Sequence, residues 1–366
     1  MDRFDIVVVG AGIIGLAVAD RLSRAGRDIL VLEKEPSFGQ HCSSRNSEVI
    51  HSGIYYPPDS LKARLCVDGN ELLYRYLREN GIRHRRCGKI VVATSEDEAP
   101  ALESLLRKGE KNGVSGLRIL TAAEVRRMEP LVRCCAGLLV PSTGIMDTHQ
   151  VMKRLEASAK ERGALVVYNA EVTSVEPAGD GFRLAVRGER EAIETGILVN
   201  CAGLWSEEIS KMAGIDSDSA AYRLSWNKGE YFKTSRYRNM SRLIYPVPEP
   251  DGAALGIHTV VRLDGELSFG PNSYSIDRID YSVDGSHLQE FVRSVGKYMD
   301  ISADDIWPDS SGIRPKLQGA GGEERDFVIS SEEGKGLPGF VNLIGIESPG
   351  LTCCLRIAEA VTGLVG

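Results

Sequence analysis

The sequence predicts a protein of the α/β class, α+β overall, in which a Rossmann-like nucleotide-binding domain carries a second, mainly antiparallel β-sheet domain. Three observations predict this fold. The first 33 residues read as a strand, a glycine-rich turn, a helix and a second strand. Residues 223–270 alternate strand patterns with turns. The C-terminus returns to a buried strand, FVNLIGI, and a helix of small residues, so we expect both chain ends in one domain.

The opening segment has the spacing of a dinucleotide-binding unit. A hydrophobic strand runs into Gly10, Gly12 and Gly15, and the helix that follows stops at Gly26. The first glycine makes the tight turn, the second lets the backbone approach a pyrophosphate, and the third lets the helix pack against the strand. The helix N-terminus favours the pyrophosphate charge. Glu33 ends the second strand, where a carboxylate can bridge ribose hydroxyls. The glycines alone leave FAD and NAD open.

The composition excludes several classes of protein. The formal net charge is -7 with Lys and Arg scattered along the chain, so we expect no nucleic-acid partner. The eight cysteines have no zinc-site spacing, which predicts no metal and reduced thiols in a cytoplasmic protein. The apolar run at residues 6–9 is too short for a signal peptide or a membrane span, and we expect no export.

Periodicity, caps and glycine stops predict the elements between the two ends. We expect helices at about 60–80, 96–112 and 286–299, one opened by the capping box of Thr121 and Glu124, and one capped by Asp147 or Thr148 and ended by Gly163. Strands are expected at 89–93, 137–140, 165–169, 171–176, 182–187 and 197–200. We divide the chain into a discontinuous cofactor-binding domain (1–82, 147–215 and 308–366) and a substrate-binding domain (83–146 and 216–307).

Several further segments are long and unusual: RNSEVIHSGIYYPPDSLKARLC, CGKIVVA, TGIMD, LVNCAGLWS, NKGEYF, LIYPVPEPDGAALGIHTVV, SFGPN, SGIRPKLQG and IESPGLT. With the opening glycines they resemble, over nearly the whole chain, the D-amino-acid oxidase type of FAD-dependent oxidoreductases, and most closely the branch of L-2-hydroxyglutarate dehydrogenases and oxidases. Three features depart from that branch. Glu48 stands where glycine is usual, Cys353 and Cys354 replace small residues, and the region after Gly270 is shorter.

The resemblance implies FAD as the cofactor and an FAD-binding Rossmann-like domain. It implies that the turn IESPGLT curls against the flavin, where backbone N–H groups of Gly350, Leu351 and Thr352 face the flavin carbonyls. The residues expected to bind the cofactor are Gly10, Gly12, Ile13, Ile14, Gly15, Glu33, Lys34, Ser43, Ser44, Arg45, Asn46, Ser47, Val172, Ala202, Gly203, Trp205, Arg314, Gly345, Gly350, Leu351 and Thr352.

Oxidation of a 2-hydroxy acid needs a base for the hydroxyl proton and a cation for the carboxylate. His51 is the first candidate base, because imidazole is largely neutral near pH 7, and His258 is the second. Arg314 is the candidate carboxylate clamp, with Lys228 and Tyr231 as helpers. Each of these residues also has a structural interpretation, as a packing histidine, a surface charge or a sheet aromatic.

The leading hypothesis is FAD-dependent oxidation of a small, L-2-hydroxyglutarate-like 2-hydroxy acid to the 2-oxo acid, by hydride transfer to flavin N5. Amine oxidation of the glycine or sarcosine type and glycerol-3-phosphate oxidation are the alternatives on the same fold. A non-catalytic flavin-binding or tRNA-modifying component ranks below these. The sequence does not decide whether the electron acceptor is oxygen or a quinone, so peripheral membrane contact also stays open. It does not predict an oligomeric state.

Overall fold

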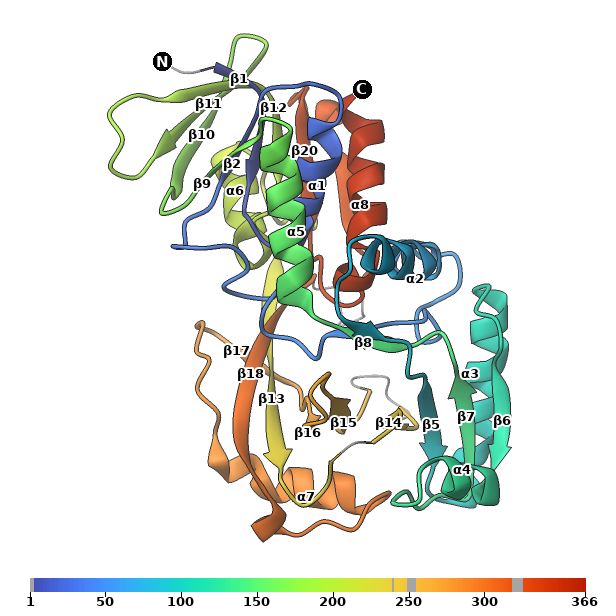
Figure 1. Ribbon diagram of the computed structural model, residues 1–366. Helices are drawn as coiled ribbons and strands as arrows, with labels where there is room; N and C mark the ends of the chain where they lie inside the picture. Colours follow the sequence, from blue (N-terminus) through green and yellow to red (C-terminus); the bar gives the residue numbers. More distant parts are fainter. Residues whose placement is uncertain (1–2, 239, 249–254, 318–324) are drawn as a thin grey trace.

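An eight-stranded sheet forms the upper half of the molecule in the computed structural model, which describes residues 3–238, 240–248, 255–317 and 325–366 (Figure 1). Five strands run parallel in the order β9, β2, β1, β12, β20. The remaining three pair antiparallel at the margins. The strands are β1 (Arg3–Val9), β2 (Ile29–Leu32), β9 (Leu165–Val167), β10 (Val172–Ala178), β11 (Gly181–Val186), β12 (Ile193–Asn200), β19 (Val328–Ser331) and β20 (Phe340–Ile344).

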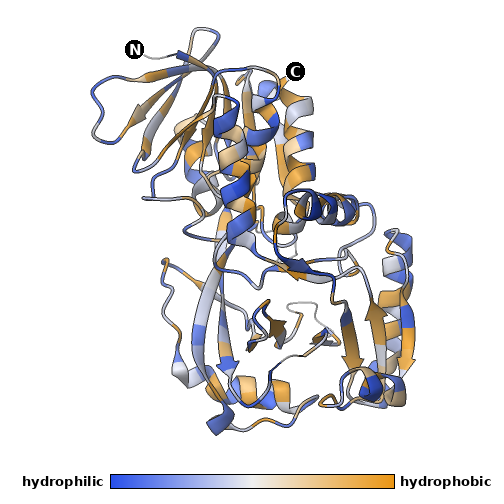
Figure 2. Cartoon of the chain, in the orientation of Figure 1, coloured by the Kyte–Doolittle hydropathy of each residue, from blue (hydrophilic) through white to orange (hydrophobic). Residues whose placement is uncertain are grey.

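Helices cover both faces of this sheet, so β1 is buried on each side. Its residues Ile6 and Val8 belong to one hydrophobic core and Val7 and Val9 to another. Such a strand reads as a continuous apolar run, as residues 6–9 (IVVV) do, and Figure 2 shows the central strands of this half mostly in hydrophobic colours. The helices are α1 (Ile13–Ser23), α2 (Leu61–Glu79), α5 (Thr148–Glu161), α6 (Ser206–Met212) and α8 (Gly350–Val365).

The two chain ends meet as expected. Strand β20 pairs with β12 in the central sheet, and α8 packs against both α1 and α2. The caps that the sequence predicts are present: Ser60 accepts from the Ala63 amide at the start of α2, and Asp147 accepts from the Gln150 amide at the start of α5. The βαβ unit predicted from the first 33 residues is confirmed.

A five-stranded antiparallel sheet forms much of the lower half. Its longest strands, β13 and β18, pair with each other over their whole length. One side of β13 also pairs with β16 and β17, and β15 follows β16. This confirms the antiparallel sheet predicted from residues 223–270. The strands are β13 (Leu224–Thr234), β15 (His258–Val261), β16 (Leu267–Gly270), β17 (Tyr274–Ile276) and β18 (Ile306–Leu317).

A four-stranded sheet in the order β14, β5, β7, β6 stands on the other side of the lower half, and a small sheet of β3, β8 and β4 lies above it (Figure 1). Thr121 and Glu124 form the predicted capping box. The elements are β3 (Val49–Ile50), β4 (His84–Arg85), β5 (Lys89–Ala93), β6 (Arg118–Thr121), β7 (Ala136–Val140), β8 (Gly144–Met146), β14 (Leu243–Pro246), α3 (Ala99–Lys111), α4 (Ala122–Met128) and α7 (Leu288–Gly296).

The domain division stays a proposal. The stretch 308–317, which we assign to the cofactor-binding domain, is part of β18 and pairs with β13, so it runs between the two halves. The middle of the LIYPVPEPDGAALGIHTVV segment and the end of SGIRPKLQG lie outside the described residues. Within the described part, no helix is both long and apolar enough to cross a membrane.

Candidate active site

One large cavity, of about 830 Å³, is lined by residues from both halves of the molecule. Most of the residues predicted to bind cofactor or substrate line it, although they come from nine separate stretches of the chain. These are Gly10, Gly12, Ile13, Ile14, Glu33, Lys34, Ser43, Arg45, Asn46, Ser47, His51, Val172, Ala202, Gly203, Trp205, Tyr231, His258, Arg314, Gly350 and Leu351. Gly15, Ser44, Lys228, Gly345 and Thr352 are not among the lining residues.

The glycine turn leaves no room for side chains. Gly10 has φ +104°, and a Cβ there would lie 2.6 Å from the carbonyl oxygen of Cys201. A Cβ on Gly15 would lie 1.9 Å from the Gly10 carbonyl oxygen, so α1 packs directly on the turn. The amide of Ile13 donates to Ser43 Oγ (3.0 Å), which draws the polar loop over the start of α1. This cradle of bare backbone at a helix N-terminus fits a pyrophosphate.

The end of β2 fits an adenosine. Glu33 is buried and its carboxylate accepts from the amides of Ala11 (2.7 Å) and Glu35 (2.9 Å), which fixes it beside the glycine turn. The ammonium of Lys34 lies 2.9 Å from the ring centroid of Trp205. Burial lowers the pKa of this lysine, and Glu35 opposes that effect. A carboxylate at this position excludes a 2′-phosphate by repulsion.

Local hydrogen bonds hold the loop between β2 and β3. Asn46 Nδ2 donates to the carbonyl oxygens of Cys42 (3.0 Å) and Ser43 (2.8 Å), and its Oδ1 accepts from the Glu48 amide (2.8 Å). Glu48 has φ +56°, a conformation that favours glycine, which accounts for the glycine usual in the similar family at this position. Its carboxylate accepts from the Thr148 amide at the start of α5 (3.2 Å).

His51 is half-buried between the start of α8 and the turn before it. Its amide donates to Thr352 Oγ1 (2.9 Å), and its Nε2 lies 3.2 Å from Ser348 Oγ. Burial, helped by the positive charge of Lys89, lowers the pKa of His51 to about 3. The imidazole is therefore neutral at physiological pH and can accept a proton. Thr352, which does not line the cavity, acts on the site through this backbone contact.

Arg314 and Asn227 face the cavity side of β13 and β18. Arg314 Nη1 donates to Asn227 Oδ1 (3.1 Å), and the two residues are register partners. A Cβ on Gly229 would lie 2.6 Å from Pro271 Cβ, 2.9 Å from the Asn272 carbonyl oxygen and 3.2 Å from Arg314 Nη2, so a glycine here lets the 271–272 segment and the guanidinium approach β13 closely. Among the described residues Arg314 has no acidic partner, which leaves its charge for an anion.

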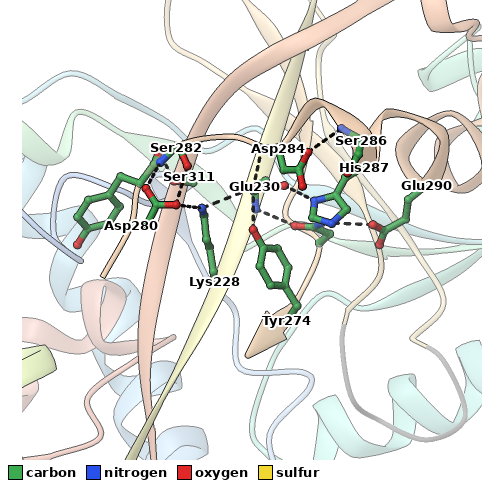
Figure 3. Close-up of polar contacts among 12 residues, drawn as sticks. Lys228, Glu230, Tyr274, Asp280, Ser282, Asp284, Ser286, His287, Glu290 and Ser311 are labelled. Carbon is green, nitrogen blue, oxygen red and sulfur yellow. Dashed lines mark hydrogen bonds and ion pairs between the residues drawn. The ribbon is translucent and has the colours of Figure 1, made fainter. Parts of the chain in front are cut away.

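The structure does not bring Lys228 to the cavity. Side chains alternate along a strand, so Gly229 and Tyr231 face the cavity while Lys228 and Glu230 point to the opposite side of β13. Figure 3 shows Lys228 Nζ between Glu230 (3.7 Å) and Asp280 (3.5 Å). Glu230 also accepts from Tyr274 OH (2.7 Å) and pairs with His287 Nδ1 (2.6 Å). Lys228 is thus engaged in an acidic network behind the site.

Three residues of the site were not among the predicted ones. Ser348 contacts His51, and Tyr245 of β14 stacks on His258 with ring centroids 3.7 Å apart. Lys89 is fully buried at the start of β5, beside Tyr245. A lysine that opens an otherwise apolar strand, as in KIVVA, is the sequence signal that points to it. The burial and stacking of His258, whose pKa burial lowers well below its usual value, favour a packing role for this histidine.

A family model described as FAD dependent oxidoreductase matches residues 5–364. A mitochondrial L-2-hydroxyglutarate dehydrogenase of Arabidopsis thaliana is 41% identical over 406 residues, covering 98% of this chain and 83% of the relative. L-2-hydroxyglutarate dehydrogenases of Indibacter alkaliphilus (30% identical, 98% of each chain) and Escherichia coli (35% identical, 86% of this chain and 72% of the relative) are also similar.

Solved structures show the same fold. An L-alpha-glycerophosphate oxidase from Mycoplasma pneumoniae with FAD bound has a TM-score of 0.89 at 23% identity and covers 100% of this chain and 95% of its own. A glycine oxidase from Geobacillus kaustophilus has a TM-score of 0.82 at 20% identity, with 100% and 95% covered. At these low sequence identities the similarity shows a shared fold and nothing more. The family match and the nucleotide cradle together make FAD the cofactor, and the chain belongs to the FAD-dependent oxidoreductases of the D-amino-acid oxidase type.

Proposed function

We propose that this enzyme oxidises the 2-hydroxy group of a small 2-hydroxy acid, with L-2-hydroxyglutarate as the first candidate, to the 2-oxo acid. The names of the similar L-2-hydroxyglutarate dehydrogenases support this substrate class. The observation that carries the proposal is the pairing of two groups in one cavity: a neutral imidazole at His51 and a guanidinium at Arg314, for which the described residues supply no acidic partner. A 2-hydroxy acid needs one of each.

Arg314 would hold the carboxylate next to the reacting carbon through two parallel hydrogen bonds. Asn227 fixes the guanidinium, and Tyr231 lines the same wall of β13. FAD, when bound, supplies the acceptor for the hydride that leaves C2. The hydroxyl proton would pass to His51, which Thr352 and Ser348 hold in place.

The low pKa of His51 fits this role once an anion binds. Burial and Lys89 disfavour the imidazolium in the free enzyme. A substrate carboxylate nearby favours the charged form and raises the pKa of His51. Substrate binding would therefore activate the base, and free enzyme would keep it neutral.

For the electron acceptor we propose oxygen or a quinone, because the flavin passes its electrons on after the substrate is oxidised. We further propose a cytoplasmic location, with peripheral membrane contact if the acceptor is a quinone. Oxygen uptake measured beside reduction of a soluble quinone analogue distinguishes the two acceptors.

The test is anaerobic reduction of the bound flavin. The purified holoenzyme is mixed with L-2-hydroxyglutarate, other 2-hydroxy acids, glycine, sarcosine or glycerol 3-phosphate, and the flavin absorbance is followed. We expect bleaching by L-2-hydroxyglutarate. Bleaching by amines alone, or by glycerol 3-phosphate alone, would replace the proposed function with that alternative.

Two variants test the residue roles in the same assay. His51→Gln should keep FAD and lose about 100-fold or more in the rate of bleaching, since a general base contributes about that much. Arg314→Ala should chiefly raise the substrate concentration needed for half-maximal bleaching. A His51→Gln variant that reduces its flavin at the normal rate would remove His51 as the base.

A further inference from the structure

Lys89 lies behind two tyrosines that line the cavity, and the described residues give it no counter-ion. Lys89 is fully buried, and within the described part of the chain its Nζ makes no hydrogen bond or ion pair. The ammonium lies 4.2 Å from the ring centroid of Tyr55 and 4.5 Å from that of Tyr245. Lysine is almost never fully buried without a partner, so this position points to a partner that the protein itself does not supply.

The titratable groups around Lys89 do not balance its charge. Burial raises the pKa of the Cys66 thiol and of the Tyr55 and Tyr245 hydroxyls, so all three are neutral at physiological pH. His51 and His258 are neutral as well, because burial, with a smaller contribution from the charge of Lys89, lowers the pKa of both. Burial in turn lowers the pKa of Lys89 to about 7. In the free enzyme the charged form of Lys89 is therefore poorly stabilised.

The two tyrosines that flank Lys89 line the cavity, and the hydroxyl of each is buried without a hydrogen-bond partner among the described residues. Tyr55 follows the loop that carries His51, and Tyr245 lies on β14, the strand that pairs with β5. Three unsatisfied donors thus gather on one side of the cavity, one of them cationic, with no acidic partner among the described residues. Buried polar groups are normally satisfied, and an anion would satisfy all three.

This wall is separate from the one that carries Arg314. Arg314 lies on β18 of the five-stranded sheet, whereas Lys89 lies on β5 of the four-stranded sheet. Among the described residues neither Arg314, which lines the cavity, nor Lys89, which lies behind its wall, has an acidic partner, and the two belong to different sheets. A substrate with one carboxylate would satisfy only one of them.

We propose that Lys89, Tyr55 and Tyr245 form a second carboxylate subsite, which takes the distal carboxylate of a dicarboxylate 2-hydroxy acid while Arg314 holds the carboxylate next to the hydroxyl. The tyrosine hydroxyls donate to the carboxylate, and Lys89 supplies the charge from behind their rings. The inference rests on the proposed function, and it makes this wall the feature that selects a dicarboxylate over a monocarboxylate.

The test uses binding without turnover. Glutarate and pentanoate are five-carbon acids that differ in one carboxylate and cannot be oxidised at a hydroxyl, and their binding to the holoenzyme is followed by the change in flavin absorbance. In Lys89→Met we expect the Kd of glutarate to rise about 10- to 100-fold and that of pentanoate less than about threefold, as for loss of a buried charge-assisted contact. Lys153→Met, which removes an exposed lysine of α5, is the matched control and should change neither.

Tyr245→Phe and Tyr55→Phe each remove one hydroxyl and should weaken the binding of glutarate about three- to tenfold without changing the binding of pentanoate. These two variants test the carboxylate subsite even if Lys89→Met fails to retain FAD. The proposed subsite would be wrong if the unmodified enzyme bound glutarate and pentanoate equally well, or if the variants lost the same factor in affinity for both acids.

The reduced flavin is the other anion that Lys89 could serve. If Lys89→Met lowers the flavin midpoint potential and leaves the preference for glutarate intact, the lysine acts on the flavin and the proposal is wrong. Because the titration needs no turnover, a holoenzyme that prefers glutarate yet oxidises no 2-hydroxy acid would contradict only the proposed function.

Discussion

Replacement of Gly15 by alanine tests the packing of α1 on the glycine turn. The added Cβ would lie 1.9 Å from the Gly10 carbonyl oxygen, more than about 1 Å inside normal contact, and both atoms belong to backbone that cannot turn aside. Overpacking of this kind costs about 3 kcal/mol or more, against a gain of about 1 kcal/mol from alanine in a helix. We expect a net loss of about 2 kcal/mol and a shift of the very turn that contacts the pyrophosphate.

The assay is the ratio of flavin to protein absorbance after gel filtration, together with the melting temperature followed by protein and flavin fluorescence. Gly363→Ala is the matched control, because Gly363 is also helical, in α8, and an added Cβ meets nothing within 4 Å. It should stabilise the protein by up to about 1 kcal/mol and keep full FAD. A Gly15→Ala variant with full FAD and an unchanged melting temperature would refute the packing argument.

Three further changes follow from the site. Lys89→Met should stabilise the ligand-free protein at about pH 7, because the fall in the lysine pKa from 10.5 to about 7 corresponds to about 4 kcal/mol of destabilisation in the unmodified protein. The unfolded chain keeps this proton up to about pH 10, so the unmodified protein gains stability as the pH rises. In urea titrations the difference in unfolding free energy between variant and unmodified protein should therefore shrink by about 2 kcal/mol between about pH 7 and pH 9. An advantage that does not change with pH would contradict a buried charge. Gly229→Ala should displace Pro271 and the Asn272 backbone, crowd Arg314 and raise the substrate concentration for half-maximal flavin reduction about tenfold; equal kinetics would show that this wall of the cavity can adjust without moving the guanidinium. Thr352→Val leaves the part-buried His51 amide without its acceptor and should slow flavin reduction about tenfold, whereas a normal rate would show that the imidazole position does not depend on this bond.

The sequence predicts the opening unit well because its signals are local. The glycines, the helix and Glu33 lie within one βαβ turn, and their spacing alone fixes which backbone groups face the cradle. The capping box at Thr121 and the cap at Asp147 are local in the same sense. Each cap depends on a contact between residues three positions apart, which can be recognised in a single sequence.

The substrate side of the cavity depends on strand phase and on pairing between distant segments. In NKGEYF the alternation separates Lys228 from Asn227 and Gly229, but only the pairing of β13 with β18 decides which set faces the cavity. Arg314 falls on the cavity side and Lys228 on the other. Lys89 and Tyr245 meet because β5 and β14 pair across more than 150 residues, a contact that no local pattern contains.

An acidic protein can bind an anion here because partners, and not the net charge, decide which charges remain available. Four glutamates of the cavity lining are engaged within the protein: Glu33 by amides beside the glycine turn, Glu48 by the start of α5, Glu171 by Arg187 at 2.6 Å, and Glu347 by Lys62 at 3.1 Å. Glu208, also in the lining, is exposed. Among the described residues Arg314 hydrogen-bonds to the neutral Asn227 and Lys89 lies over two aromatic rings, and neither has an acidic partner. The fold thus engages most of the carboxylates near the site and leaves these two cations available for an anion, although the chain carries a formal charge of -7. A small dicarboxylate is the ligand that would complete this arrangement.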